Sequence, residues 1–208
     1  AARDADLVWI CTPSNPIGNT VSDETVEAII AATDGLVVVD AAYAEFGEAD
    51  WSERVEDHHN LLVLRTLSKA FGLAGARVGY AMAHPDLIAA IDGVRPPGSI
   101  ASTSVDLAIA ALDSPIQMRK AVESLTASRT NLANRLTSLG LRVLPSTTNF
   151  VLCEVGAAAP AVARQLIDVG LVPRQFPTDG PLGEYLRFTV RTEEAHERLA
   201  SARERTLR

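Results

Sequence analysis

Cysteine is scarce in this 208-residue chain, which contains only Cys11 and Cys153. Each lies inside an apolar run, so we expect two small buried side chains rather than a disulfide or metal ligands. No apolar run is long enough to span a bilayer, and we expect no signal peptide. His58 and His59 lack spaced cysteine or acidic partners, which argues against zinc. These absences predict a cytoplasmic protein without a metal site.

Basic residues are also in the minority. The chain has 19 lysines and arginines against 26 aspartates and glutamates, a formal net charge of -7. This balance argues against nucleic acid or an anionic membrane as the main partner. The hydrophobic share of 47% and the charged share of 22% are typical of a soluble globular protein. The length allows one substantial core, or a core with a smaller lobe.

The most informative stretch is RTLSKAFGLAGARVGY, at residues 65–80. It follows residues 61–64, which have the length and branching of a buried parallel strand. Thr66, Ser68 and Lys69 are therefore expected at the carboxyl end of a strand, where open α/β sheets bind ligands. Desolvation and neighbouring cations expose the lone pair of a lysine nitrogen, which is the condition for Schiff-base chemistry. We therefore expect Lys69 to act as a nucleophile.

The same stretch contains the donors for a phosphate site. Arg77 would add a guanidinium fork to the hydroxyls of Thr66 and Ser68. Gly72 and Gly75 would allow the backbone to turn closely around the phosphate. Taken alone, the pattern also fits a lysine that reaches solvent from a surface loop. Two earlier stretches favour the ligand site.

Two further apolar runs, at residues 7–11 and 36–40, predict strands that end in polar groups. The first leads to Asn15, and the second ends in Asp40 and is followed by Tyr43. Residues 22–34 between them predict a helix, so the stretch is a βαβ unit with a parallel sheet. An amide, an acid with a phenol, and a lysine with phosphate donors are therefore expected at one sheet edge. Pyridoxal phosphate needs this set of groups.

Four motifs can be read in order along the chain: SNPIG at 14–18, VVVDAAY at 37–43, RTLSKAFGLAGARVGY at 65–80 and LRFTV at 186–190. They resemble those of the fold-type I pyridoxal-phosphate-dependent aminotransferases of classes I and II, and most closely the histidinol-phosphate aminotransferases. The resemblance implies an α/β fold with a mostly parallel sheet, in which the strand at 78–83 is antiparallel and the Asn15-Pro16 bond is cis. It implies part of the large domain at 1–97, connecting helices at 98–139 and a small domain at 140–208.

The resemblance also implies pyridoxal 5'-phosphate as cofactor, with Lys69 as the catalytic residue. Asp40 would pair with the pyridine nitrogen, and Asn15 and Tyr43 would donate hydrogen bonds to the 3' oxygen. Arg187 would bind the acidic group of the substrate, and Arg174 would assist with a phosphate. The cofactor-binding residues implied are Asn15, Asp40, Tyr43, Thr66, Ser68, Lys69 and Arg77, and the substrate-binding residues are Arg174 and Arg187.

The implied reaction transfers the amino group of histidinol phosphate to 2-oxoglutarate, which gives imidazole acetol phosphate and glutamate. Its partners would be a small-molecule amino donor, a 2-oxo acid and a second copy of the chain in a homodimer. An aromatic amino-acid aminotransferase or a threonine-phosphate decarboxylase would share Lys69, Asp40 and Arg77. The chain enters a strand soon after Ala1, so we expect the C-terminal part of such an enzyme. A non-catalytic fragment with a vestigial cofactor pocket is the alternative from another class.

The remaining patterns predict supporting structure. Residues 45–60 are polar and acidic around Trp51, which is typical of a surface excursion. The helix expected at 114–139 carries an apolar stripe from Ile116 to Leu139, which predicts core packing. Further helices are expected at 84–94, 104–112, 158–169 and from 193, and further strands at 141–144, 149–153, 171–174 and 185–190.

Overall fold

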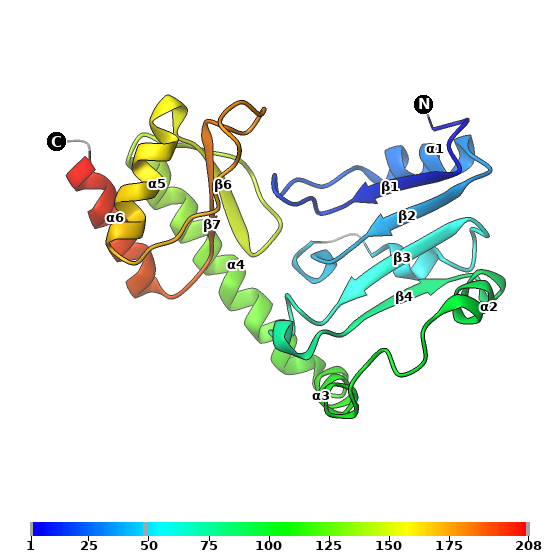
Figure 1. Cartoon of the computed structure of the whole chain (residues 1–208). Helices are drawn as coiled ribbons and strands as arrows, with labels where there is room; N and C mark the ends of the chain where they lie inside the picture. Colours follow the sequence, from blue (N-terminus) through cyan, green and yellow to red (C-terminus); the bar gives the residue numbers. More distant parts are fainter. Residues whose placement is uncertain (1, 48–49, 207–208) are drawn as a thin grey trace. The chain divides into compact units, whose positions relative to one another are not determined.

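The computed structural model describes residues 2–47 and 50–206, and it has the α/β fold that the sequence predicts (Figure 1). The chain forms two compact units. The first unit comprises residues 1–14 and 20–122, and the second comprises residues 15–19 and 123–208. The residues that we expected at one ligand site are therefore divided between two units.

The first unit contains a four-stranded sheet in the order β1 (Leu7–Cys11), β2 (Leu36–Asp40), β3 (Leu61–Thr66) and β4 (Gly79–Ala83). The first three strands are parallel and β4 is antiparallel to β3, which confirms both predictions. In the register of the sheet, Cys11 pairs with Asp40 and Asp40 pairs with Leu64. Asp40 therefore lies at the carboxyl end of the sheet's second strand.

Helix α1 (Asp23–Ala32) covers one face of this sheet, and its ends follow from the sequence. The Ser22 hydroxyl accepts a hydrogen bond from the Thr25 backbone N–H (3.3 Å), as an N-cap does. The buried side chains of α1 are those of Val26 and Ile30. They pack in a core with the alternate strand residues that face the helix, which are Ile10, Val37, Val39, Leu61 and Val63.

The connection between β2 and β3 is a surface segment with a buried anchor. It includes the short helices η1 (Ala44–Phe46) and η2 (Trp51–Arg54), and Trp51 is buried in the core with α1. Arg54 stacks on the Trp51 ring at 4.5 Å and pairs with Asp23 and Glu27 of α1. Among the described residues of 45–60, only Phe46 and Trp51 are buried, and the indole ties this surface segment to the core.

Three helices follow the sheet: α2 (Pro85–Val94), α3 (Ser102–Leu112) and α4 (Pro115–Ser138). The boundary between the two units falls within α4. The apolar stripe predicted on α4 packs only in part, because Leu132 and Leu136 are buried whereas Ile116 is 62% exposed. None of the described helices is both long enough and apolar enough to cross a membrane.

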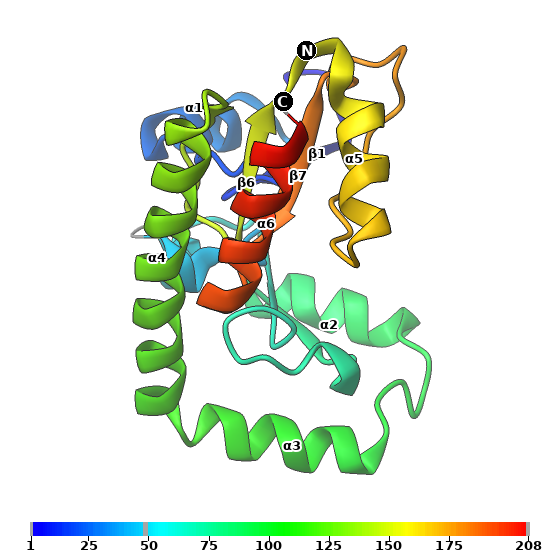
Figure 2. The same ribbon diagram turned by 90° about the vertical axis from the view of Figure 1, so that its left-hand side faces the viewer.

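The second unit contains an antiparallel sheet in the order β5 (Arg142–Val143), β6 (Phe150–Glu154) and β7 (Tyr185–Thr189). Figure 2 shows α6 (Glu193–Thr206) in front of β6 and β7, with α4 and α5 (Ala159–Asp168) on either side. One sheet face packs against these helices. Its core includes Leu132, Leu136, Val151, Cys153, Val162, Leu166, Leu186, Phe188 and Leu199.

The strand predicted at 171–174 is not present. Only Arg174 pairs, through an isolated antiparallel bridge with Arg187. Pro173 lacks the N–H group that a strand interior requires, and Val172 is 80% exposed. A short apolar run with proline in it therefore forms an edge contact rather than a strand.

Candidate functional site

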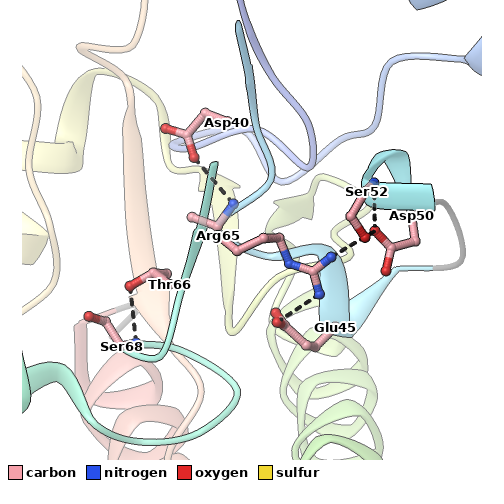
Figure 3. Close-up of polar contacts among 8 residues, drawn as sticks. Asp40, Glu45, Asp50, Ser52, Arg65, Thr66 and Ser68 are labelled. Carbon is pink, nitrogen blue, oxygen red and sulfur yellow. Dashed lines mark hydrogen bonds and ion pairs between the residues drawn. The ribbon is translucent and has the colours of Figure 1, made fainter. Parts of the chain in front are cut away.

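The first group of predicted site residues gathers at the carboxyl end of β2 and β3. The half-buried carboxylate of Asp40 accepts a hydrogen bond from the Ala42 backbone N–H (3.2 Å; Figure 3). Tyr43, three residues further on, is buried. The Nζ atom of Lys69 lies 5.3 Å from the centroid of the Tyr43 ring. The structure thus brings the predicted lysine and phenol into contact beyond the end of the sheet.

The loop that carries Lys69 is fixed by the backbone around it. Leu67 is fully buried, its N–H donates to the Val78 carbonyl (3.2 Å), and its carbonyl accepts from the Leu73 N–H (2.9 Å). Gly72 donates to the Lys69 carbonyl (3.1 Å) and has a φ of 68°, a conformation that favours glycine. This loop therefore presents Lys69 from a tightly bonded turn.

Thr66 and Ser68 lie together at the start of the same loop. The Thr66 hydroxyl accepts a hydrogen bond from the Ser68 N–H (3.1 Å; Figure 3) and donates to the Val78 carbonyl (3.3 Å). Arg77 is exposed in the left-handed region (φ 55°), and its guanidinium donates to the Ala74 carbonyl (3.2 Å). Gly75 does not share the positive φ of Gly72. The guanidinium of Arg77 thus bonds within its own loop.

The second group of predicted residues lies in the second unit. Arg187 donates to Asn15 Oδ1, and its guanidinium carbon lies 4.7 Å from the centroid of the Phe150 ring. The Asn15-Pro16 peptide bond is cis, as predicted. Leu186 and Phe188 are buried in the core on the other face of β7, so Arg187, which alternates with them along the strand, points away from that core. Asn15 and Arg187 therefore form one local site.

Arg174 is paired with Arg187 through the backbone. The Arg174 N–H donates to the Arg187 carbonyl (2.9 Å), and the Arg187 N–H donates to the Arg174 carbonyl (3.0 Å). Residues paired in this way carry their side chains on the same face of a sheet. Two cationic side chains consequently start from neighbouring positions on the face that bears Arg187.

A buried charge cluster was not predicted from the sequence. Arg65 on β3 pairs with Glu45 (2.9 Å) and with Asp50 (2.7 Å; Figure 3). Burial acts to lower the pKa of Arg65, but the charge and hydrogen bond of Glu45, together with those of Asp50, outweigh it and raise the pKa. Burial also raises the pKa of neighbouring Tyr80. The available signal was an arginine within an apolar strand, because a buried charge requires a partner.

The sequence matches the family model for class I and II aminotransferases over residues 1–202, so the chain belongs to this family. It is 40% identical over 197 residues to histidinol-phosphate aminotransferase 2 of Archaeoglobus fulgidus, covering 94% of this chain and 57% of that protein. It is 37% identical over 178 residues to an aromatic amino acid aminotransferase of Rhodococcus erythropolis, covering 84% and 50%.

A solved structure agrees with this assignment. The crystal structure of histidinol-phosphate aminotransferase from Sinorhizobium meliloti, in complex with pyridoxal-5'-phosphate, matches with a TM-score of 0.89 and 31% identity. The match covers 99% of this chain and 59% of that chain. The present chain thus spans between half and two thirds of the length of these relatives.

Proposed function

We propose that the chain takes part in pyridoxal-phosphate-dependent amino transfer from histidinol phosphate to 2-oxoglutarate, which yields imidazole acetol phosphate and glutamate. The observation that carries the proposal is the contact between Lys69 Nζ and the Tyr43 ring, beside the strand that ends in Asp40. The A. fulgidus and S. meliloti relatives carry the name of this activity, and the S. meliloti structure contains the cofactor.

The donor set of the first unit fits the cofactor. Asp40 uses its Oδ1 atom for the Ala42 N–H, and a half-buried carboxylate of this kind suits a protonated ring nitrogen. Ser68, Thr66 and Arg77 would supply the phosphate donors, and Tyr43 would supply a donor for the 3' oxygen. The role of Asn15, which belongs to the second unit, stays a prediction. Bound pyridoxal phosphate supplies an electron sink that stabilises negative charge at the substrate Cα.

Lys69 has two roles in this proposal. Its Nζ atom would hold the cofactor covalently, and as a free amine it would take up and return the proton at the substrate Cα. Both roles require that Nζ return to the same position beside the cofactor and the substrate Cα. The bonded turn around Leu67 and Gly72 limits the positions of the Lys69 backbone, which supports this requirement.

The two arginines of the second unit favour a phosphate-bearing substrate. Like charges on directly opposed positions of a sheet are destabilising, and an anion between them would relieve the repulsion. Guanidinium groups bind phosphate oxygens in a bidentate manner. Histidinol phosphate carries a phosphate and no carboxylate, so Arg174 and Arg187 would act on the same group. An aromatic amino acid, which carries a single carboxylate, is the second candidate because of the R. erythropolis relative.

A cofactor-binding experiment can identify the lysine that reacts, because the chain contains only two lysines, Lys69 and Lys120. The chain is incubated with pyridoxal phosphate and scanned in the visible range. We expect absorption above about 400 nm that disappears on borohydride reduction and leaves a mass tag on Lys69. Lys69→Ala should lose the tag, and Lys120→Ala, at an exposed position on α4, should keep it. Protein that stays colourless with the cofactor would favour a non-catalytic module.

The substrate is tested on protein that takes up the cofactor. Histidinol phosphate and phenylalanine are compared as amino donors by kcat/KM, and we expect histidinol phosphate to be preferred. Release of carbon dioxide would identify a decarboxylase instead. The homodimer and the cytoplasmic location stay predictions, and sedimentation of the loaded protein tests the first.

A further inference from the structure

The cluster of Arg65, Glu45 and Asp50 lies on the sheet face opposite Thr66. Successive residues of a strand point to opposite faces, and Figure 3 shows Arg65 directed away from Thr66 and toward the two acids. The side chains of Arg65 and Glu45 are only 10% and 5% exposed. Asp50 is 42% exposed and also accepts a hydrogen bond from the Ser52 N–H (3.0 Å). The cluster thus consists of a buried ion pair, between Arg65 and Glu45, and a more exposed ion pair, between Arg65 and Asp50.

The buried ion pair between Arg65 and Glu45 joins the segments that carry Tyr43 and Lys69. Glu45 follows Tyr43 by two residues in a turn whose backbone is internally bonded, since the Phe46 N–H donates to the Tyr43 carbonyl (3.0 Å). Arg65 precedes Lys69 by four residues, at the end of β3. The ion pair therefore links the Tyr43 turn directly to the strand that leads into the Lys69 loop.

Stability alone does not account for this pair. Replacing a buried ion pair by apolar side chains of similar volume is often neutral or stabilising, because the charges must be desolvated. Here two polar atoms of the pair, Glu45 Oε2 and Arg65 Nε, are buried without a hydrogen-bond partner. What the pair supplies is a fixed direction and distance between two segments.

We propose that Arg65 and Glu45 are positioning residues, whose ion pair holds the phenol of Tyr43 against Lys69 Nζ. The inference rests on the proposed function, because it names what holds two residues of that site in register. Groups at a reacting centre must be held within about 0.5 Å of the productive geometry, and their supporting residues determine whether they are. Asp50, which forms the more exposed ion pair with Arg65, serves mainly to cap η2.

The test compares four variants with the wild type. The double variant Arg65→Met/Glu45→Leu replaces the pair by apolar groups, and Arg65→Met alone leaves the buried Glu45 without its partner. Glu45→Gln removes one charge at constant volume, and Asp50→Asn alters only the exposed ion pair. Thermal unfolding should rank Arg65→Met alone as the least stable, with the double variant recovering most of the loss. Because the double variant should be nearly as stable as the wild type, a change in its site would report a displaced Tyr43 turn rather than an unfolded protein.

Two sets of measurements, one on unloaded and one on loaded protein, report the position of Tyr43. In unloaded protein, backbone amides of residues 43–47 should exchange about 10-fold faster in the double variant, with α1 unchanged. In loaded protein, the pH midpoint of the absorption change above about 400 nm should move by about one unit, and the Kd for pyridoxal phosphate should rise about 10-fold. Glu45→Gln should shift both readouts in the same direction, and Asp50→Asn should shift neither.

Wild-type exchange and a wild-type spectrum in the double variant would overturn the inference, and so would equal effects of Asp50→Asn. Should the double variant not fold, Glu45→Gln decides by the same two readouts. A wild-type chain that takes up no cofactor would refute the proposed function. The exchange experiment on unloaded protein would still show whether the pair holds the Tyr43 turn.

Discussion

Gly18 and Ser146 lie so close together that no Cβ atom fits between them. A Cβ on Gly18 would lie 2.5 Å from Ser146 Oγ and 2.8 Å from Ser146 Cβ. Gly18 also has a φ of 93°, and its carbonyl accepts a hydrogen bond from the Thr147 N–H (2.9 Å). The loop that carries Asn15 is thereby fastened to the loop before β6 within the second unit.

Gly18→Ala should lower the free energy of unfolding by about 2 to 3 kcal/mol, because backbone strain and overpacking add. Urea unfolding followed by circular dichroism measures the change. Gly140→Ala is the matched control, since Gly140 has a φ of 80° with no atom within 4 Å of a built Cβ. It should cost only about 1 kcal/mol, the strain alone. Equal losses in the two variants would contradict the close contact with Ser146.

His196 should make stability depend on pH. Its buried imidazole accepts a hydrogen bond from the Arg191 N–H at Nε2 (3.0 Å), and Nδ1 lies 3.7 Å from Glu193. Burial lowers the pKa of His196 below its ordinary 6.5, assisted by the charge of Arg135 and opposed by that of Glu193. The unfolded chain therefore binds more protons than the folded chain as the pH falls through 6.5.

The free energy of unfolding should accordingly fall between about pH 7 and pH 5, with a contribution from this group of at most about 1.4 kcal/mol per pH unit. Urea titrations at several pH values measure the slope. His196→Gln should remove this contribution, whereas His59→Gln, at an exposed position, should retain it. An unchanged slope in His196→Gln would show that other groups cause the dependence.

The two cysteines should differ in reactivity. Cys153 is fully buried, and burial raises its pKa from 9.0 to about 12. Its thiolate fraction at pH 8 is then about 10⁻⁴. Iodoacetamide should alkylate half-buried Cys11 in the native protein and leave Cys153 unmodified, as mass spectrometry would show. In concentrated urea both should react.

The raised pKa of Cys153 should also make the free energy of unfolding depend on pH. Between pH 9 and about 12 the unfolded chain loses the Cys153 proton and the folded chain retains it, so the free energy of unfolding decreases as the pH rises. Cys153→Ala should remove that part of the alkaline slope. Rapid alkylation of Cys153 in native protein at pH 8 would contradict its burial.

Local signals were sufficient for most elements of the first unit. The apolar runs at 7–11 and 36–40 correspond residue for residue to β1 and β2, because each is bounded by turn-forming residues. Ser22 caps α1 as its hydroxyl and the following acids indicate. The parallel pairing of β1 with β2 followed from the βαβ pattern, and the parallel direction of β3 from the length and branching of residues 61–64. The direction of β4 came only from the resemblance to a family.

Contacts between distant residues could not be predicted. The burial of Trp51 depends on α1, and the partner of Arg65 lies twenty residues earlier, at Glu45. Pairing at Arg174 depends on β7, whereas the local run at 171–174 suggested a full strand. The residues of the candidate site were identified by type and order, yet their grouping into two units is a tertiary property. Their roles stay predictions.

Arg174 provides a test of the substrate that is independent of Lys69. Its backbone pairing places its side chain beside that of Arg187, and under the proposed function both bind the phosphate of the amino donor. Arg174→Gln should lower kcat/KM for histidinol phosphate about 10- to 100-fold, the loss of one charged hydrogen-bonding group. The value for phenylalanine should change less than about 3-fold, because Arg187 remains for its carboxylate.

Inorganic phosphate should also raise the unfolding midpoint of the wild type more than chloride at equal ionic strength, and Arg174→Gln should lose this difference. Arg164→Gln, at an exposed position on α5, is the matched control and should behave as the wild type. Equal losses for the two amino donors would show that Arg174 supports the fold or a step common to both, and would remove the argument for a phosphate-bearing substrate.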